Sequence, residues 1–159
     1  MFDFSKYGVP QKRKDRLTYY SHNRFSKDLL EELLSIHKSN RIKDKNCSMI
    51  EELGEVIQIM LSKVIGAGRF RGYTAEWRIE MGGTGLLYAC KYLHNFNPKK
   101  SNDPTNYINM ILHNGILQGL KKLKTYHQNF GERVNENSDE SDNEKVSESL
   151  ITHMETDLL

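Results

Sequence analysis

A chain of 159 residues has room for one modest domain with tails, and a domain of this size buries only part of its surface. Hydrophobic residues make up 37% and charged residues 28%, and no apolar run approaches the roughly 20 residues that a membrane-spanning helix needs. The basic patch near the N-terminus is not followed by the apolar segment of a signal peptide. We therefore expect a cytoplasmic protein without a membrane contact.

Charge is unevenly distributed along the chain. From Glu132 to Leu159, nine acidic residues stand against two basic ones, a net charge of −7. Of the chain's 23 basic and 21 acidic residues, 21 basic and 12 acidic ones fall in residues 1–131, which leaves a net charge of +9. A basic body with an acidic tail is typical of a nucleic-acid-binding protein with a separate, solvated arm.

The first 25 residues mix basic, aromatic and turn-forming residues without a sustained period, which predicts a partly ordered basic N-terminal arm over residues 1–25. The pattern changes at Ser26, a candidate N-cap. Apolar residues recur behind it at helical spacing, namely Leu29, Leu30, Leu33, Leu34 and Ile36. We expect a helix to about Lys38 and a loop over residues 39–47.

Ser48, followed three residues later by Glu51, forms a capping box. The apolar stripe behind it consists of Ile50, Leu53, Ile57, Met60, Leu61 and Val64. This pattern predicts a second helix that ends near Gly66.

Thr74 is the next candidate N-cap, and apolar positions from Trp77 to Leu93 predict a third helix over residues 75–94. This helix contains three glycines, Gly82, Gly83 and Gly85. Each destabilises a helix by about 1 kcal/mol relative to alanine. We therefore expect close packing, or the approach of a partner, to compensate for them.

Asp103 and Pro104 form a clear helix start, because Asp caps a helix and Pro fits its first position. The fourth helix should run over residues 104–124. The spacing of Gly115 and Gly119 indicates that this helix packs closely in a soluble core. Four helices and no convincing strand predict an all-α domain over residues 26–131. Residues 132–159 form an acidic linker that cannot fold alone, followed by a C-terminal motif with returning apolar residues.

No catalytic constellation emerges from the sequence, and we expect neither an enzyme nor a cofactor. The glycines at positions 66, 68 and 72 resemble a dinucleotide-binding fingerprint, but their spacing is wrong and a helix precedes them. The six histidines are scattered. Only two cysteines, Cys47 and Cys90, are present and they are far apart, so no metal site is expected.

The polar side of the fourth helix admits two interpretations. It carries amides and positive charge: Asn106, Asn109, His113, Asn114, Gln118, Lys121, Lys122 and Lys124. Amides hydrogen-bond base edges and lysines neutralise phosphates, which favours DNA binding. Taken alone, the pattern favours a solvated face over DNA binding, because charged surface helices are common.

A resemblance adds a third line of argument. The order of motifs from Trp77 to Lys124 resembles the central region of bacterial sigma factors, and more closely the late-transcription sigma factors of T-even-like bacteriophages. The matching pieces are Gly72-Tyr73-Thr74, Trp77, Glu80-Met81, Gly85, Lys91, Leu93 to Phe96, Pro104, Tyr107-Ile108, Gln118 and Lys121-Lys122. The resemblance covers about residues 50–124 and implies a sigma region 2-like fold.

The resemblance also implies roles for individual residues. The third helix would dock on the clamp helices of the largest subunit of host core RNA polymerase, through Trp77, Glu80, Gly83, Thr84 and Leu87. The fourth would recognise an AT-rich minus-ten-type late promoter element. The residues implied for DNA binding are Tyr107, Met110, Ile111, His113, Asn114, Leu117, Gln118, Lys121, Lys122 and Lys124. The setting would be the cytoplasm of the infected bacterial host, at the nucleoid.

One departure from the sigma pattern affects promoter opening. Primary sigma factors have a tryptophan pair where this chain has Met110 and Ile111. Apolar wedges separate base steps but stack on them less well than aromatic rings do, so we expect melting to depend on other factors.

A single short recognition helix gives limited affinity, so we expect a co-activator, and in the phage family such help comes from the replicative sliding clamp. A clamp-binding motif is implied at Leu150, Ile151, Met154, Glu155, Asp157 and Leu158, with a terminus carrying stray apolar residues as the alternative. Two rival functions stay open. One is a helical polymerase-binding adaptor, such as an anti-sigma factor or co-activator, that does not recognise promoters. The other is a free-standing DNA-binding repressor.

Overall fold

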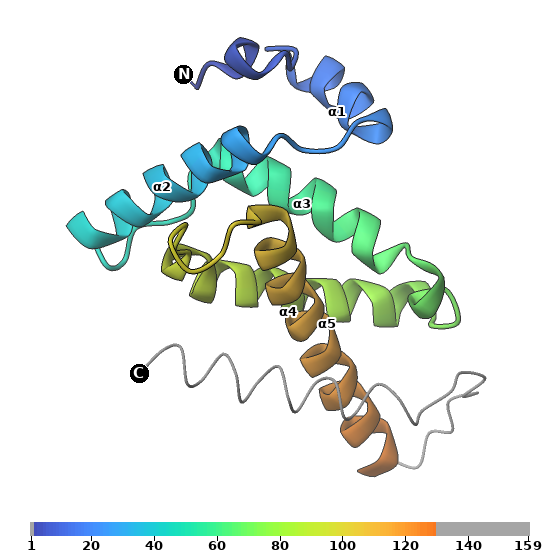
Figure 1. Ribbon diagram of the computed structural model, residues 1–159. Coiled ribbons are helices and arrows are strands. Elements are labelled where there is room, and N and C mark those ends of the chain that lie inside the picture. Colours follow the sequence, from blue (N-terminus) through green and yellow to red (C-terminus); the bar gives the residue numbers. More distant parts are fainter. Residues whose placement is uncertain (1, 130–159) are drawn as a thin grey trace.

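The structure, a computed structural model, describes residues 2–129, and every regular element in that part of the chain is a helix (Figure 1). The prediction of an all-α protein is therefore confirmed. Five α-helices and three short 3-10 helices follow one another as η1 (Phe4–Tyr7), α1 (Arg13–His22), α2 (Lys27–Lys43), α3 (Glu51–Ile65), η2 (Gly68–Phe70), α4 (Ala75–Tyr92), η3 (Leu93–Asn95) and α5 (Pro104–Asn129).

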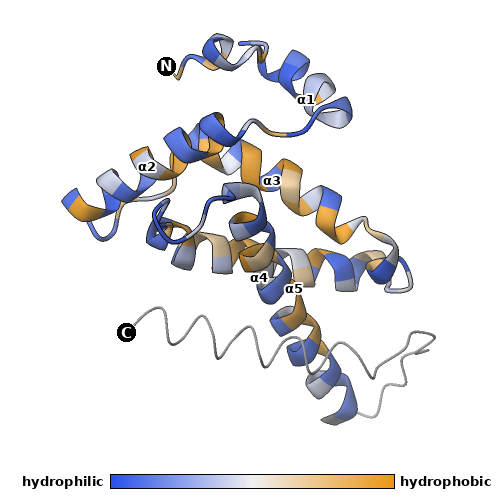
Figure 2. Ribbon diagram, in the orientation of Figure 1, coloured by the Kyte–Doolittle hydropathy of each residue, from blue (hydrophilic) through white to orange (hydrophobic). Residues whose placement is uncertain are grey.

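The helices pack around α3, α4 and α5. α4 and α5 share the largest interface, α3 packs on both, and α2 contacts η3 and the first part of α5. Figure 2 shows that α3 is apolar along much of its length whereas α1 is mostly hydrophilic. Leu53, Val56 and Ile57 of α3 are accordingly buried in the core. The C-terminal half of α5 extends beyond the other helices (Figure 1).

Three of the predicted helix starts are confirmed in atomic detail. The side chain of Ser26 accepts a hydrogen bond from the backbone N–H of Leu29 at 3.5 Å, and that of Thr74 from Trp77 at 3.3 Å. The side chain of Asp103 likewise caps α5 by accepting a hydrogen bond from the backbone N–H of Asn106 at 3.1 Å. Each bond satisfies a backbone donor that the first turn of a helix leaves without a partner. The sequence located these starts because capping is a local interaction.

The capping box at Ser48 is not used, and that prediction was wrong. α3 begins at Glu51, with Ile50 at the N-cap position and no side-chain hydrogen bond. Met49 and Ile50 pack against the core, whereas Ser48 is exposed. Burial of these two apolar side chains therefore determines how the chain enters α3.

Two helices extend further than predicted. α2 continues to Lys43, through part of the expected loop, and Arg41 in its last turn donates to the carbonyl oxygen of Cys47 at 3.4 Å. α5 continues to Asn129 instead of ending near Lys124. Its last turns are held by the ring of His127, which stacks on Trp77 with centroids 4.8 Å apart.

The N-terminal arm is the largest correction to the predicted organisation. Residues 2–22 form η1 and α1 and pack on the domain, so the described chain has five α-helices instead of four. Phe4, Val9 and Tyr20 are buried in the core. Their spacing is irregular, which explains why no helical period revealed them.

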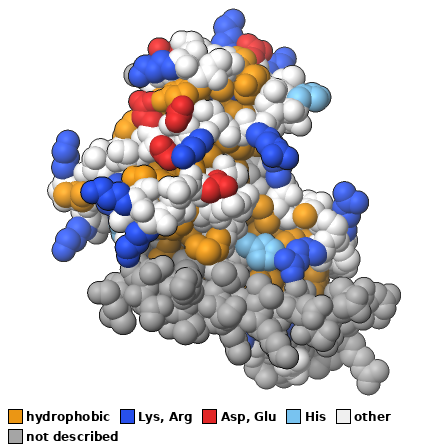
Figure 3. All heavy atoms as spheres, in the orientation of Figure 1, with side chains coloured by type: hydrophobic (Ala, Val, Ile, Leu, Met, Phe, Trp, Pro, Cys, Tyr) orange, Lys and Arg blue, Asp and Glu red, His pale blue; other side chains and the backbone are white. Residues whose placement is uncertain are grey.

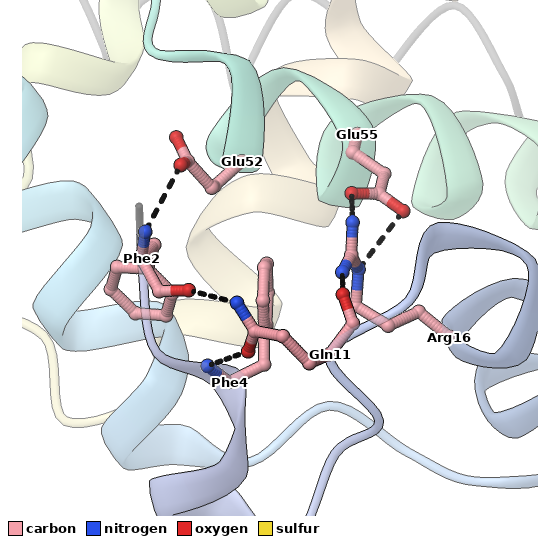
Figure 4. Close-up of polar contacts among 6 residues, drawn as sticks. All are labelled: Phe2, Phe4, Gln11, Arg16, Glu52 and Glu55. Carbon is pink, nitrogen blue, oxygen red and sulfur yellow. Dashed lines mark hydrogen bonds and ion pairs between the residues drawn. The ribbon is translucent and has the colours of Figure 1, made fainter.

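Arg16 anchors this segment (Figure 4). Its guanidinium group makes two bonds to Glu55 of α3, from Nε to Oε1 at 3.2 Å and from Nη2 to Oε2 at 2.7 Å. Nη1 donates to the carbonyl oxygen of Gln11, and the charged group lies 4.2 Å from the ring centroid of Phe4. Both partners of the ion pair are about nine-tenths buried. A buried and bidentate pair of this kind fixes geometry.

Candidate nucleic-acid interface

The crossing of α4 and α5 fixes the orientation of both predicted functional helices. Gly115 of α5 lies so close to α4 that a Cβ added to it would be 2.7 Å from the Cα of Gly85. A Cβ on Gly119 would lie 2.9 Å from the Cα of Met81. The close packing predicted from the spacing of these two α5 glycines is therefore confirmed. Because the backbones touch there, only the other faces of α4 and α5 are left for solvent, for the remaining helices or for a partner.

The outer face of α4 is the exposed one. Ile79 is 72% exposed and Leu87 is 69% exposed, two uncommonly accessible apolar side chains. Glu80 and Gly83 lie between them and are also exposed, and a Cβ at Gly83 would meet no atom within 4 Å. Three of the five predicted polymerase-contacting residues, Glu80, Gly83 and Leu87, therefore lie on one open stripe. We call this stripe, together with Ile79, the α4 stripe.

The other two predicted contacts lie elsewhere. Trp77 is only 8% exposed, and its ring stacks on Tyr73 (centroids 5.9 Å apart) and on His127. Thr84 is half-buried against Gly119 of α5. As a correction, the structure places Trp77 in packing between helices, because its large apolar surface is covered by the last turns of α5.

The ten residues predicted to contact DNA divide by burial. Ile111, Asn114 and Leu117 are buried in the helix interfaces, so the expectation that their side chains meet DNA is corrected. The other seven residues are accessible to solvent. Lys121 and Lys122 are exposed, and Tyr107, Met110, His113, Gln118 and Lys124 are half-buried. The period of α5 could not separate these groups, because α5 packs on α2, α3 and α4 over more than one face.

Arg69 extends the basic face of α5 and was not predicted. It comes from η2, and its Nη1 lies 2.6 Å from Nε2 of His113. Burial lowers the pKa of His113 and the positive charge of Arg69 lowers it further. A neutral ring accepts the arginine N–H, so the pair carries one positive charge at neutral pH. Only the fold brings these residues together, since 44 positions separate them.

A cleft of about 1080 Å³ opens at the N-terminal end of α5. The C-terminal half of α2, the segment around η3 and the first turns of α5 form its walls, and we call it the α2–α5 cleft. Its cationic side chains are Lys38, Arg41, Lys45 and Lys100. The remaining polar and aromatic lining consists of Tyr92, His94, Asn95, Asn97, Ser101, Asn106 and Tyr107, and the apolar lining of Ile42 and Met110.

The charged side chains that line the cleft are all positive among the residues described. No acidic residue is among the described residues that line it. In Figure 3, Lys and Arg side chains surround the C-terminal end of α2, while acidic side chains gather over the upper and central parts of this face. A concave basic surface concentrates positive potential and attracts anions. The sequence did not reveal this contribution, although Lys38 and Arg41 are three residues apart, as on one face of α2, and Lys45 follows two residues after the helix ends.

Hydrogen bonds hold the aromatic wall of the cleft in place. The hydroxyl group of Tyr107 donates to the carbonyl oxygen of Tyr92 at 3.1 Å, and its ring lies 5.1 Å from that of Phe96. Lys38 donates through Nζ to the carbonyl oxygen of Phe96 at 3.4 Å. The ring of Tyr107 is therefore fixed at the edge of the cleft before any ligand arrives.

Two histidines lie at this end of the molecule. Burial lowers the pKa of His37, and His94 and Arg41 lower it further. Burial likewise lowers the pKa of His94, with Arg41 and Lys38 adding to the effect. Both rings are therefore neutral at neutral pH, and the positive charge of the cleft comes from its lysines and Arg41.

The side chains that line the cleft are of types that bind nucleic acids. Lysine and arginine neutralise phosphates, aromatic rings stack on unpaired bases, and amides hydrogen-bond base edges. Within residues 2–129, no three His, Cys, Asp or Glu side chains gather as metal ligands, and no helix is both long and apolar enough to span a membrane. The predicted clamp-binding motif, Leu150 to Leu158, lies outside the described residues.

Comparison with known proteins adds no relative. No protein-family model matches this chain, and no curated protein matches it significantly. Functional interpretation therefore depends on the residues and the geometry of the chain itself.

Proposed function

We propose that this chain is a small sigma-type initiation factor, which binds core RNA polymerase and recognises an AT-rich late promoter element of a bacteriophage. One observation carries the proposal, namely the α2–α5 cleft. There Tyr107 and Met110, two residues predicted to meet promoter bases, share a concave surface with four cationic side chains. Single-stranded nucleic acid is bound by this combination of stacking rings and a basic groove.

The α4 stripe supports the polymerase half of the proposal. Gly85 faces α5 and Gly82 faces α3, so close packing accounts for both. Gly83 has no such neighbour and lies between exposed Ile79 and Leu87. A bare backbone flanked by apolar side chains fits the close approach of a partner helix. In this proposal the partner is a clamp helix of the largest polymerase subunit.

Promoter opening depends on Met110 in this scheme. Ile111, the second residue in the place of the tryptophan pair, lies in the core. A single half-buried methionine is a weak wedge, because separating a base step costs a few kcal/mol. We propose that the sliding clamp and a co-activator supply the missing free energy by holding residues 150–158, in the cytoplasm of the infected host.

Reconstitution with bacterial core polymerase tests the two surfaces separately. We expect Ile79→Ser/Leu87→Ser to weaken core binding while leaving the binding of single-stranded DNA by the free protein intact. Lys38→Glu/Arg41→Glu/Lys45→Glu should weaken the binding of single-stranded DNA while leaving core binding intact. For three lost phosphate contacts, the slope of log affinity against log salt should become shallower by roughly 2.

Lys12→Glu/Arg13→Glu/Lys14→Glu is the matched control, since it makes the same change in charge at exposed positions of the N-terminal segment. Failure of the unmodified chain to bind core polymerase would sink the proposal.

A polymerase-binding adaptor without promoter recognition is the principal alternative. It predicts that Lys121→Glu/Lys122→Glu/Lys124→Glu leaves activity intact, whereas a sigma factor would lose promoter opening. The basic cleft favours the sigma factor, because an adaptor has no use for a nucleic-acid groove. A free-standing repressor instead predicts salt-sensitive binding of duplex promoter DNA without polymerase, which a gel-shift assay with and without core separates.

A further inference from the structure

The α2–α5 cleft and the segment Glu136–Glu144 carry opposite charges. Four cationic side chains line the cleft, and no acidic residue is among its described lining residues. Glu136–Glu144 contains five acidic residues and no basic one. A free protein therefore holds, within one chain, both a basic concave surface and a polyanion able to fill it.

We propose that the acidic residues of Asp139–Glu144, within this segment, occupy the α2–α5 cleft in the free protein and compete there with single-stranded DNA. The identity of the competing ligand rests on the proposed function. The occupancy itself rests only on charge, chain length and the shape of the cleft. Such a contact in cis is autoinhibitory, because the protein admits unpaired DNA only when the acidic segment leaves.

The chain is long enough for this contact. From Tyr107 at the cleft to Asn129 at its end, α5 spans 22 residue steps, or roughly 33 Å at 1.5 Å per residue. An extended chain covers at most about 3.3–3.6 Å per residue. Ten residues beyond Asn129 therefore just reach the cleft, and fifteen residues reach roughly 50 Å. Asp139 and Glu144 lie ten and fifteen residues beyond Asn129, so Asp139–Glu144 can reach the cleft, whereas Glu136, seven residues beyond Asn129, falls short of it.

A weak contact is sufficient because it is intramolecular. A ligand joined to its site by a short stretch of chain has an effective concentration on the order of 1 mM. If a free peptide of this composition bound with a dissociation constant of roughly 0.1–1 mM, the tethered segment would weaken DNA binding about two- to tenfold. Exposed charges are screened within about 10 Å at 0.1 M salt, so the inhibition should fade as salt rises.

The cleft is a better acceptor than the lysines that lie closer to the segment. Lys121 and Lys122 are exposed on α5, as Lys45 and Lys100 are in the cleft, whereas Lys38 and Arg41 of the cleft are half-buried and therefore less screened by solvent. In the cleft, cations are grouped in a concavity beside amide donors. Asn97 accepts a hydrogen bond from the backbone N–H of Lys99 through Oδ1 at 3.0 Å, which leaves its NH₂ group to donate to a carboxylate.

Carbodiimide cross-linking of the full chain at low concentration tests the occupancy without DNA, because the reagent joins carboxylates to lysine amines in contact. We expect mass spectrometry of the monomer to find carboxylates of Asp139–Glu144 joined to Lys38, Lys45 or Lys100, and 0.5 M salt to suppress these links. Lys38→Arg/Lys45→Arg/Lys100→Arg keeps the charge but removes the amines, so it should lose the links. Links only to Lys121 or Lys122 would overturn the proposal.

Fluorescence anisotropy with a labelled AT-rich single-stranded oligonucleotide tests the competition. Neutralising the segment (Glu136→Gln, Asp139→Asn, Glu140→Gln, Asp142→Asn and Glu144→Gln) should raise affinity about two- to tenfold at low salt. The control makes the same change in net charge at exposed positions of the folded body, namely Asp3→Asn, Asp15→Asn, Asp28→Asn, Glu51→Gln and Glu76→Gln. An equal rise in both variants would refute occupancy of the cleft.

The two assays separate the inference from the function on which it rests. Cleft cross-links that single-stranded DNA displaces support both. Cleft cross-links in a protein that binds no DNA support the occupancy and refute the proposed function. DNA binding that is unchanged by neutralisation, in a protein without cleft cross-links, refutes the inference and leaves the proposed function standing.

Discussion

Replacing Gly115 with alanine tests the close crossing of α4 and α5. The added Cβ would lie 2.7 Å from the Cα of Gly85 and 3.0 Å from the carbonyl oxygen of Thr84. Both are backbone atoms, so no side-chain rotation relieves the overlap and α4 must move away from α5. Overpacking of this kind destabilises by up to about 3 kcal/mol, and the better helix propensity of alanine returns about 1 kcal/mol. We expect Gly115→Ala to reduce the free energy of unfolding by about 2 kcal/mol.

Gly83→Ala is the matched control on the open face of α4. Nothing lies within 4 Å of its added Cβ, so only helix propensity acts. We expect the free energy of unfolding to rise by about 0.5–1 kcal/mol. Urea denaturation followed by circular dichroism measures both variants, with an unchanged m-value indicating that only stability has changed. Equal stability of the two variants would refute the close crossing of α4 and α5.

Three further predictions follow from buried polar groups. Arg16→Met leaves Glu55 buried without a partner, so it should lower the free energy of unfolding by about 3–5 kcal/mol. The double variant Arg16→Met/Glu55→Met should regain most of that loss in the same urea titration, and a double variant as unstable as the single one would contradict the assignment. The pKa of His37 is lowered in the folded state, so its stabilisation is present above the unfolded value of 6.5 and is lost as pH falls through the folded pKa. His37→Leu should therefore flatten the decline of melting temperature below about pH 6.5, whereas an unchanged decline would exclude His37 as its source. Burial raises the pKa of Tyr20 to about 12, so stability should also decline between about pH 10 and 12, and Tyr20→Phe should reduce that decline in alkaline urea titrations.

The sequence by itself determined the fold class and most of the helix starts. Ser26, Thr74 and Asp103 cap helices because their side chains bond to N–H groups three residues away, an interaction contained in the local sequence. The close approach at Gly115 and Gly119 was also predictable, since two glycines one turn apart leave a bare strip on a helix.

Only the tertiary structure decided the position of the N-terminal segment and the form of the candidate site. Arg16 and Glu55 are 39 residues apart, and no periodicity in residues 1–25 indicates that pairing. The α2–α5 cleft likewise joins α2 to a segment more than 50 residues further along the chain. On α5, a polar pattern placed Asn114 with the DNA-contacting residues, but packing buried it. Which face of a helix meets solvent depends on every helix that packs against it, and the sequence of that helix alone does not contain this information.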